Sequence, residues 1–205
     1  MIFEMRTYLL RPGVVAEAER RFEQALAHRT PFSKLAGFWH TEAGLLNQII
    51  HIWPYESIQQ RMQVRAEAVK SGNWPPKIRD LLVDMESRIV VPAAFSPPLE
   101  PRNFGRLYEI CVDSYQAGGP DLAAQGWSKS IRRRTGLSPL VACGRTEIGP
   151  LNQWIHIWAY QDAADRERVQ ETLVNDAAWP PSEGWDQPIR QERMLVVPAS
   201  FSPLQ

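Results

Sequence analysis

The chain has 205 residues, of which 44% are hydrophobic and 22% are charged, as in ordinary globular proteins. Its 23 basic residues match its 23 acidic ones, so a net charge of zero gives no electrostatic footprint for nucleic acid or for an anionic membrane surface. No stretch of about 18 apolar residues is present to span a bilayer. The two cysteines lack C-x-x-C spacing, which argues against a disulfide framework and a zinc site. The N-terminus shows no targeting pattern, and we therefore expect a cytoplasmic protein.

The first predicted element is a half-buried strand over residues 2–9, because its side chains alternate between two faces. One face carries an apolar set that begins with Phe3 and Met5, and the other carries Glu4, Arg6 and Tyr8. A Pro-Gly pair ends this strand, and apolar residues at helical spacing then predict a helix over about residues 15–27.

The rest of the first half continues as two strands, a helix and a last strand. Strands are predicted over residues 37–42 and 47–53, and a helix over residues 58–69 that begins at the caps Glu56 and Ser57. One or two further helical turns around Ile78 and Leu81 precede the last strand, residues 86–91. The resulting order, β-α-β-β-α-β, is that of the ferredoxin-like motif.

The second half of the chain repeats the first. "GLLNQIIHIWPYES", residues 44–57, returns as "GPLNQWIHIWAYQD", residues 149–162, and most equivalent positions differ by 105. Internal similarity of this length predicts two copies of one structural unit. We expect a first unit over residues 1–98 and a second over residues 99–205, joined through the Pro-rich stretch "FSPPLEPRN".

Repetition has a physical reason in this fold class. A four-stranded ferredoxin-like sheet has helices on one face and a bare face on the other, and two copies can cover each other. We therefore predict an α+β protein in which two antiparallel sheets pack face to face as a dimeric α/β-barrel-like structure, with the helices outside. The space between the sheets is the place where we expect a small organic ligand.

Strand alternation also suggests which side chains line that space. The pair Ile50 and Ile52 suits packing against helices, so the opposite face, with His51 and Trp53, should point between the sheets. Trp39 could wall an aromatic pocket there or simply fill the barrel. The predicted ligand-binding residues are Glu4, Arg6, Tyr8, Trp39, Asn47, His51 and Trp53 in the first half, and Glu109, Asn152, His156 and Trp158 in the second, where Cys111 and Asp113 share the same face.

These motifs carry a resemblance to a known family. "FEMRTYLLRPG" at the start, "GLLNQIIHIWPYES" with its echo, and "VVPAAFSP" resemble the NIPSNAP family, which is similar to the wider group of dimeric α/β-barrel domains. The resemblance covers nearly the whole chain and implies the tandem ferredoxin-like fold. It implies no defined chemistry, because the family has no agreed molecular activity, although its animal members are similar to mitochondrial scaffold and signalling proteins. The second half departs from the pattern, since Arg6 and Thr7 correspond to Cys111 and Val112.

The candidate catalytic residues are His51, His156 and Arg6, and each has a structural alternative. Either histidine could be an acid or base, or could only hydrogen-bond a neighbouring Asn or carboxylate inside the sheet. Glu4 and Arg6 could orient an anionic substrate, or could form an internal ion pair with Glu86 or Arg88 on the last strand. Because Arg6 has no counterpart in the second half, we expect His156 to feel mainly Glu109 and to titrate above His51.

Three functions follow as hypotheses. The first is a small-molecule binder, or a cofactor-independent enzyme of the monooxygenase or isomerase type. The second, disfavoured for lack of room beside Trp, is a haem protein with an axial His. The third is a non-catalytic interaction protein. We expect a homo-oligomer, with no nucleic-acid partner and no metal.

Two groups of arginines are expected to have structural roles only. Arg61 and Arg65 should form a solvated face of a helix, and Arg132–Arg134 should lie at the end of a helix, where cations suit the helix dipole.

Overall fold

The computed structural model describes residues 1–176, 179 and 187–205. Each half has the predicted β-α-β-β-α-β order, and we call the two halves the first and second repeats. The first repeat comprises β1 (Ile2–Leu10), α1 (Val15–Leu26), β2 (Gly37–Ala43), β3 (Gln48–Tyr55), α2 (Ile58–Lys70) and β4 (Leu82–Pro92). The second comprises β5 (Leu107–Ser114), α3 (Gly119–Thr135), β6 (Leu140–Ile148), β7 (Gln153–Tyr160), α4 (Ala163–Val174) and β8 (Arg190–Pro198).

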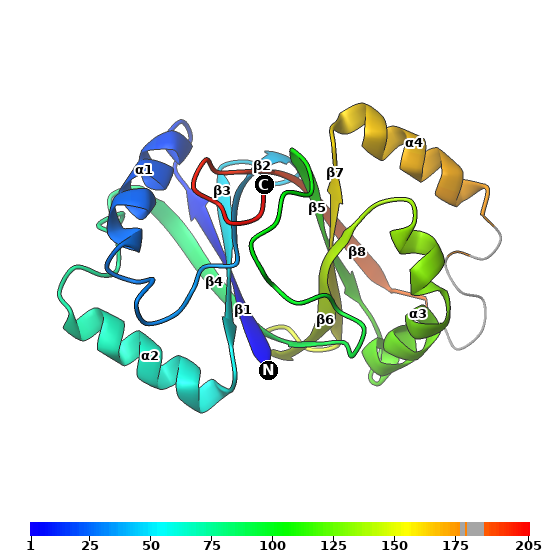
Figure 1. Ribbon diagram of the computed structural model, residues 1–205, viewed down its shortest axis with the longest axis horizontal. Helices are drawn as coiled ribbons and strands as arrows, with labels where there is room; N and C mark the ends of the chain where they lie inside the picture. Colours follow the sequence, from blue (N-terminus) through cyan, green and yellow to red (C-terminus); the bar gives the residue numbers. More distant parts are fainter. Residues whose placement is uncertain (177–178, 180–186) are drawn as a thin grey trace.

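The eight strands form one closed antiparallel barrel in the order β1-β3-β2-β8-β5-β7-β6-β4. The strand pairs β2–β8 and β4–β6 join the two repeats, so each edge of one sheet is hydrogen-bonded to an edge of the other. Helices α1 and α2 lie outside the barrel on one side and α3 and α4 on the opposite side (Figure 1). The predicted α+β class and helix-outside barrel are confirmed, and the closed ladder leaves no free sheet edge at these junctions.

The barrel interior is apolar and is built from both repeats. Phe3, Met5, Ile50 and Ile52 of the first repeat join one buried cluster with Ile110 and other residues of the second. The alternation predicted for β1 and β3 is therefore correct, but the assignment of the faces is wrong. Ile50 and Ile52 point into the barrel, and the face with His51 and Trp53 points toward the helices. Both faces of each sheet are covered, so alternation groups the side chains without telling which group is inside.

Two local features differ from the expectation. The segment before β4 forms a single turn at residues 78–81 rather than one or two helical turns, and β4 begins at Leu82. Asn47 and Asn152 lie in the turns before β3 and β7 with φ angles of 60° and 57°, where Asn tolerates the left-handed conformation better than most residues. The Asn in the repeated phrase thus serves the hairpin turn and not a strand face.

The cap of α2 agrees with the prediction, since the Ser57 hydroxyl accepts a hydrogen bond from the Gln60 amide at 3.1 Å. Within the described residues, no helix combines the length and apolarity needed to cross a membrane.

Candidate functional site

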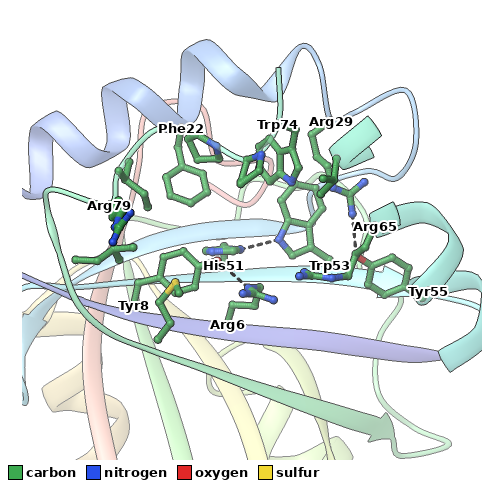
Figure 2. Close-up of a pocket in the computed structure, with 16 residues that line it drawn as sticks. Arg6, Tyr8, Phe22, Arg29, His51, Trp53, Tyr55, Arg65, Trp74 and Arg79 are labelled. Carbon is green, nitrogen blue, oxygen red and sulfur yellow. Dashed lines mark hydrogen bonds between the residues drawn. The ribbon is translucent and has the colours of Figure 1, made fainter. Parts of the chain in front are cut away.

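A cavity with an aromatic lining lies between the sheet and the helices of the first repeat, on the outer face of the barrel wall (Figure 2). Its volume is about 460 Å³. Strands β1, β3 and β4 form its floor, and α1, α2 and the segment after α2 form its walls. The cavity is lined by Arg6, Tyr8, Phe22, Arg29, His51, Trp53, Tyr55, Arg65, Val69, Trp74, Pro75, Pro76, Ile78, Arg79, Leu82 and Met85.

His51 lies at the centre of the cavity floor and is only 1% exposed (Figure 2). The indole N–H of Trp53, which can only donate, donates to His51 Nδ1 at 2.6 Å. Neutral His51 therefore carries its proton on Nε2, which has no hydrogen-bond partner among the described residues. Burial, followed by the charge of Arg6, lowers the pKa of His51 to about 3. His51 is thus a neutral hydrogen-bond donor at physiological pH, and its lone pair is already used.

Glu4 lies beside the cavity, between the sheet and α2, and neutralises part of the surrounding positive charge. Its buried Oε1 accepts hydrogen bonds from Arg6 at 2.8 Å, Arg61 at 2.5 Å and Ser87 at 2.7 Å. Burial alone would raise the pKa of Glu4, but the hydrogen bond from Arg61 and the charge of Arg6 hold it at about 2. Arg6 does form an internal ion pair, but its partner is Glu4 on its own strand, and Glu86 and Arg88 pair with each other instead. The solvated face predicted for Arg61 is wrong, because this helix residue reaches the sheet.

Arg29, which the sequence reasoning missed, is another cation of this site. It follows α1, is only 2% exposed, and has its guanidinium 4.5 Å from the ring centroid of Trp53. Arg29 Nη2 donates to the Tyr55 hydroxyl at 2.8 Å, whereas Nη1 has no hydrogen-bond partner among the described residues. The signal was present in the repeat, because Arg29 and Tyr55 recur 105 positions later as Arg134 and Tyr160.

The equivalent cavity in the second repeat has a volume of about 360 Å³. There His156 Nδ1 accepts from Trp158 at 2.7 Å, and His156 Nε2 donates to Asp113 at 3.1 Å. Burial lowers the pKa of His156, and the hydrogen bond with Asp113 opposes that shift. The sequence had suggested Glu109 as the carboxylate that faces His156. The structure shows that it is Asp113. Asp113 also accepts from Arg193 at 2.7 Å.

The buried glutamate is repeated as well. Glu109 accepts from Arg166 at 2.6 Å and from the Tyr160 hydroxyl at 3.1 Å. Arg134, which we expected only to end a helix, is buried and lies 3.7 Å from the ring centroid of Trp158. Its Nη1 donates to the Ser138 hydroxyl at 2.7 Å and its Nη2 to Tyr160 at 3.2 Å. Arg29 Nη1 and His51 Nε2 have no partner among the described residues. The equivalent nitrogens in the second repeat, Arg134 Nη1 and His156 Nε2, each have one.

The structure divides the predicted site residues into three groups. Arg6, Tyr8, His51 and Trp53 line the first cavity, with Glu4 behind them, and Glu109, His156 and Trp158 line the second with Cys111 and Asp113. Trp39 lies inside the barrel, where its ring centroid is 5.4 Å from that of Tyr108. The two asparagines lie in turns, as described above. The residues therefore form two separate sites and not one space between the sheets.

The model of the family described as NIPSNAP matches residues 3–97 and again residues 108–203. The chain belongs to the NIPSNAP family. Protein NipSnap homolog 3A of Homo sapiens is 30% identical to it over 217 aligned positions, which cover all of this chain and 86% of that protein. A NIPSNAP repeat thus occurs twice, in agreement with the 105-residue periodicity and with the eight-stranded barrel.

Solved structures outside the NIPSNAP family share the fold. A putative monooxygenase from Fusobacterium nucleatum matches with a TM-score of 0.66 and 10% identity, covering 96% of this chain and 91% of that one. A putative chlorite dismutase matches with a TM-score of 0.59 and 13% identity, covering 97% and 94%. At such low identity these structures establish the architecture and not the chemistry.

Proposed function

We propose that this NIPSNAP protein binds a small organic ligand in the cavity of the first repeat, between the sheet and helices α1 and α2. The observation that carries the proposal is His51 Nε2, a buried hydrogen-bond donor without a partner among the described residues, at the floor of a cavity of about 460 Å³. Buried polar groups in native proteins are almost always hydrogen-bonded. A ligand atom that accepts a hydrogen bond would satisfy this donor.

The cavity has the composition of a ligand pocket. Its walls are mainly aromatic and aliphatic, and a few polar groups converge on its floor. The rings of Trp53 and Trp74 lie 5.9 Å apart and nearly perpendicular, and Phe22 lies 6.1 Å from Trp74. The space predicted between the two sheets is packed with apolar side chains instead. The helix-facing side is therefore the better place for a ligand.

The chemistry of His51 favours binding over catalysis by this residue. A general base needs a free lone pair and a pKa near the working pH. His51 has neither, since Trp53 occupies Nδ1 and the pKa is about 3. A neutral imidazole can still polarise a carbonyl by donating a hydrogen bond. An enzyme of the cofactor-independent monooxygenase or isomerase type would need its base from another group or from the substrate.

Haem ligation does not fit the two histidines. Iron binding at Nε2 would leave the imidazole proton on Nδ1, where it would face the indole N–H of Trp53 or Trp158. Two donors facing each other at 2.6 to 2.7 Å cannot form a hydrogen bond. The cytoplasmic location and self-association stay predictions of the sequence.

Ligand binding at this site can be tested with the full chain and a metabolite library, using the rise in thermal unfolding temperature as the readout. For each compound that stabilises the protein, the rise in unfolding temperature is then measured on the Val69→Trp variant. This substitution places a bulky ring at the cavity wall formed by α2. Val69 is 56% exposed, so the fold tolerates the change. The matched control is Val174→Trp, at the equivalent position of α4. We expect Val69→Trp to abolish stabilisation and Val174→Trp to leave it intact; stabilisation that survives Val69→Trp would place the ligand elsewhere.

A further inference from the structure

The two cavities differ sharply in charge. Within the described residues, the first is lined by four arginines, Arg6, Arg29, Arg65 and Arg79, and by no carboxylate. Among the described residues, the second is lined by three arginines and by two carboxylates, Glu109 and Asp113. Glu4 lies beside the first cavity and forms ion pairs with Arg6, Arg61 and, at the longer distance of 3.6 Å, Arg65, so one carboxylate is shared by three guanidinium groups. The first cavity therefore carries an excess of positive charge that the second has largely lost.

Arg29 shows where this charge is available. Its guanidinium is held in place by the face of Trp53 and by the hydrogen bond to Tyr55, while Nη1 is buried and lacks a partner among the described residues. The same nitrogen of Arg134 donates to Ser138 in the second repeat. An unpaired donor on a buried cation costs more free energy than one on a neutral group, and a negatively charged oxygen is its strongest partner.

Arg65 adds a second, more accessible cation to the same cavity. It projects from α2, is 40% exposed and lies 3.6 Å from Glu4, beyond hydrogen-bond distance. Its equivalent in the second repeat is the uncharged Gln170. Figure 2 shows Arg29 and Arg65 on the same side of the cavity, beside Trp53 and Tyr55, and His51 near the centre of the floor.

The remaining walls suit an apolar group. Phe22, Trp74, Ile78, Leu82 and Met85 line the cavity, and none of them offers a charge. A ligand of this site thus meets Arg29 and Arg65 on one side, with Arg79 on the opposite side in Figure 2, and flat or aliphatic surfaces over much of its length. Burying its apolar body against these walls removes apolar surface from water and so favours binding.

We propose that the ligand class of the first cavity is an organic oxyanion, a carboxylate or phosphate on an apolar, preferably aromatic, body. The anionic head lies against Arg29 and Arg65, and the body lies against the aromatic walls. This inference rests on the proposed function, since it assigns a chemical class to the ligand of that same site.

The test uses isothermal titration of the full chain with three probes of nearly equal shape: naphthalene-2-acetate, 2-naphthyl phosphate and the uncharged naphthalene-2-acetamide. We expect at least one of the two anions to bind about tenfold more tightly than the amide, as for a hydrogen bond to a charged group. The preference between the two anions separates a carboxylate site from a phosphate site.

Two variants locate the charge. Arg65→Gln gives the first repeat the residue found in the second and should reduce the affinity for the preferred anion about three- to tenfold, with little change for the amide. Arg29→Gln should have a larger effect. Its matched control, Arg134→Gln, removes the same stacking and tyrosine contacts from the second repeat and should leave binding unchanged. If Arg29→Gln fails to fold, Arg65→Gln and the comparison of the anions with the amide still test whether the site binds an organic oxyanion.

The outcomes separate the two proposals. Equal binding of the amide and both anions, or anion binding insensitive to Arg65→Gln, would overturn the oxyanion inference while leaving ligand binding at the cavity in place. Failure of all three probes to bind, together with a library in which no compound loses its effect in Val69→Trp, would overturn the proposed function itself.

Discussion

The two repeats use the same framework to different ends. Both hold a buried glutamate, a histidine fixed by a tryptophan N–H, and an arginine stacked on that tryptophan. They differ on the first strand of each repeat, where Arg6 and Tyr8 correspond to Cys111 and Asp113. Asp113 accepts hydrogen bonds from His156 and Arg193, so these donors of the second cavity already have a partner within the protein. The Tyr8 hydroxyl accepts from Arg6, and His51 Nε2 has no partner among the described residues, so this donor of the first cavity stays available.

This contrast separates the structural from the functional part of the motif. The Glu–Arg pairs that fasten α2 and α4 to the sheet are present in both repeats and are explained by stability alone. The groups that only the first repeat contains, Arg6, Tyr8 and Arg65, all line its cavity. A ligand site is therefore best sought where the sequence of one repeat differs from that of the other.

The largest expected effect comes from separating the repeats. A chain of residues 1–98 would expose the inner face with Phe3, Met5, Ile50 and Ile52, and would leave β2 and β4 as open edges. We expect such a chain to self-associate or aggregate rather than fold as a monomer. Sedimentation and thermal unfolding followed by circular dichroism would measure this, and a monomer with a cooperative transition would contradict the shared core.

The next effect distinguishes the two buried glutamates. Glu4→Gln leaves Arg6 and Arg61 without their carboxylate inside the protein, and we expect a loss of about 3 to 5 kcal/mol of unfolding free energy. Glu109→Gln should cost less, about 1 to 3 kcal/mol, because its partner Arg166 is more exposed and can reach water. Urea unfolding of both variants tests the order, and equal losses would show that the two networks are equivalent.

Glu4 also predicts a dependence of stability on pH. Its pKa in the folded protein, about 2, is below the ordinary value of 4.5, so its contribution is complete above pH 4.5 and is lost as the pH falls toward 2. The shift corresponds to about 3 kcal/mol. Unfolding free energies measured from pH 6 to pH 3 should fall in the natural protein. In Glu4→Gln the fall should be smaller, and an unchanged slope would show that other carboxylates govern acid unfolding.

These contrasts also show what the sequence could and could not provide. The 105-residue offset identified the repeats. Hydrophobic periodicity predicted the element order and the grouping of Glu4, Arg6, Tyr8, His51 and Trp53 on one face. It could not tell which face lies inside, because β3 is covered on both sides, by the second repeat and by the helices. Arg29 was missed because it lies in a loop, where no periodicity marks a buried side chain.

A smaller effect concerns the titration of the two histidines. Burial lowers both pKa values, Arg6 lowers that of His51 further, and Asp113 opposes the shift at His156. We expect NMR titration to find His156 above His51, which should stay neutral throughout the range in which the fold is stable. Asp113→Asn should lower the pKa of His156 and leave His51 unchanged. A His156 that titrates at or below His51 in the natural protein would remove the asymmetry.

The two repeats should not differ in the tautomer of the neutral imidazole. Trp53 donates to His51 Nδ1 at 2.6 Å and Trp158 to His156 Nδ1 at 2.7 Å, so both neutral rings should carry the proton on Nε2. Long-range ¹H–¹⁵N correlation spectra at neutral pH should therefore show the same pattern for the two residues. Trp53→Phe removes the donor that fixes His51 and should allow a second tautomer there, while His156, still held by Trp158 and Asp113, keeps one. A mixture at His51 in the natural protein would mean that the indole does not fix the ring, and that Nε2 is not the constant donor on which ligand binding at this cavity depends.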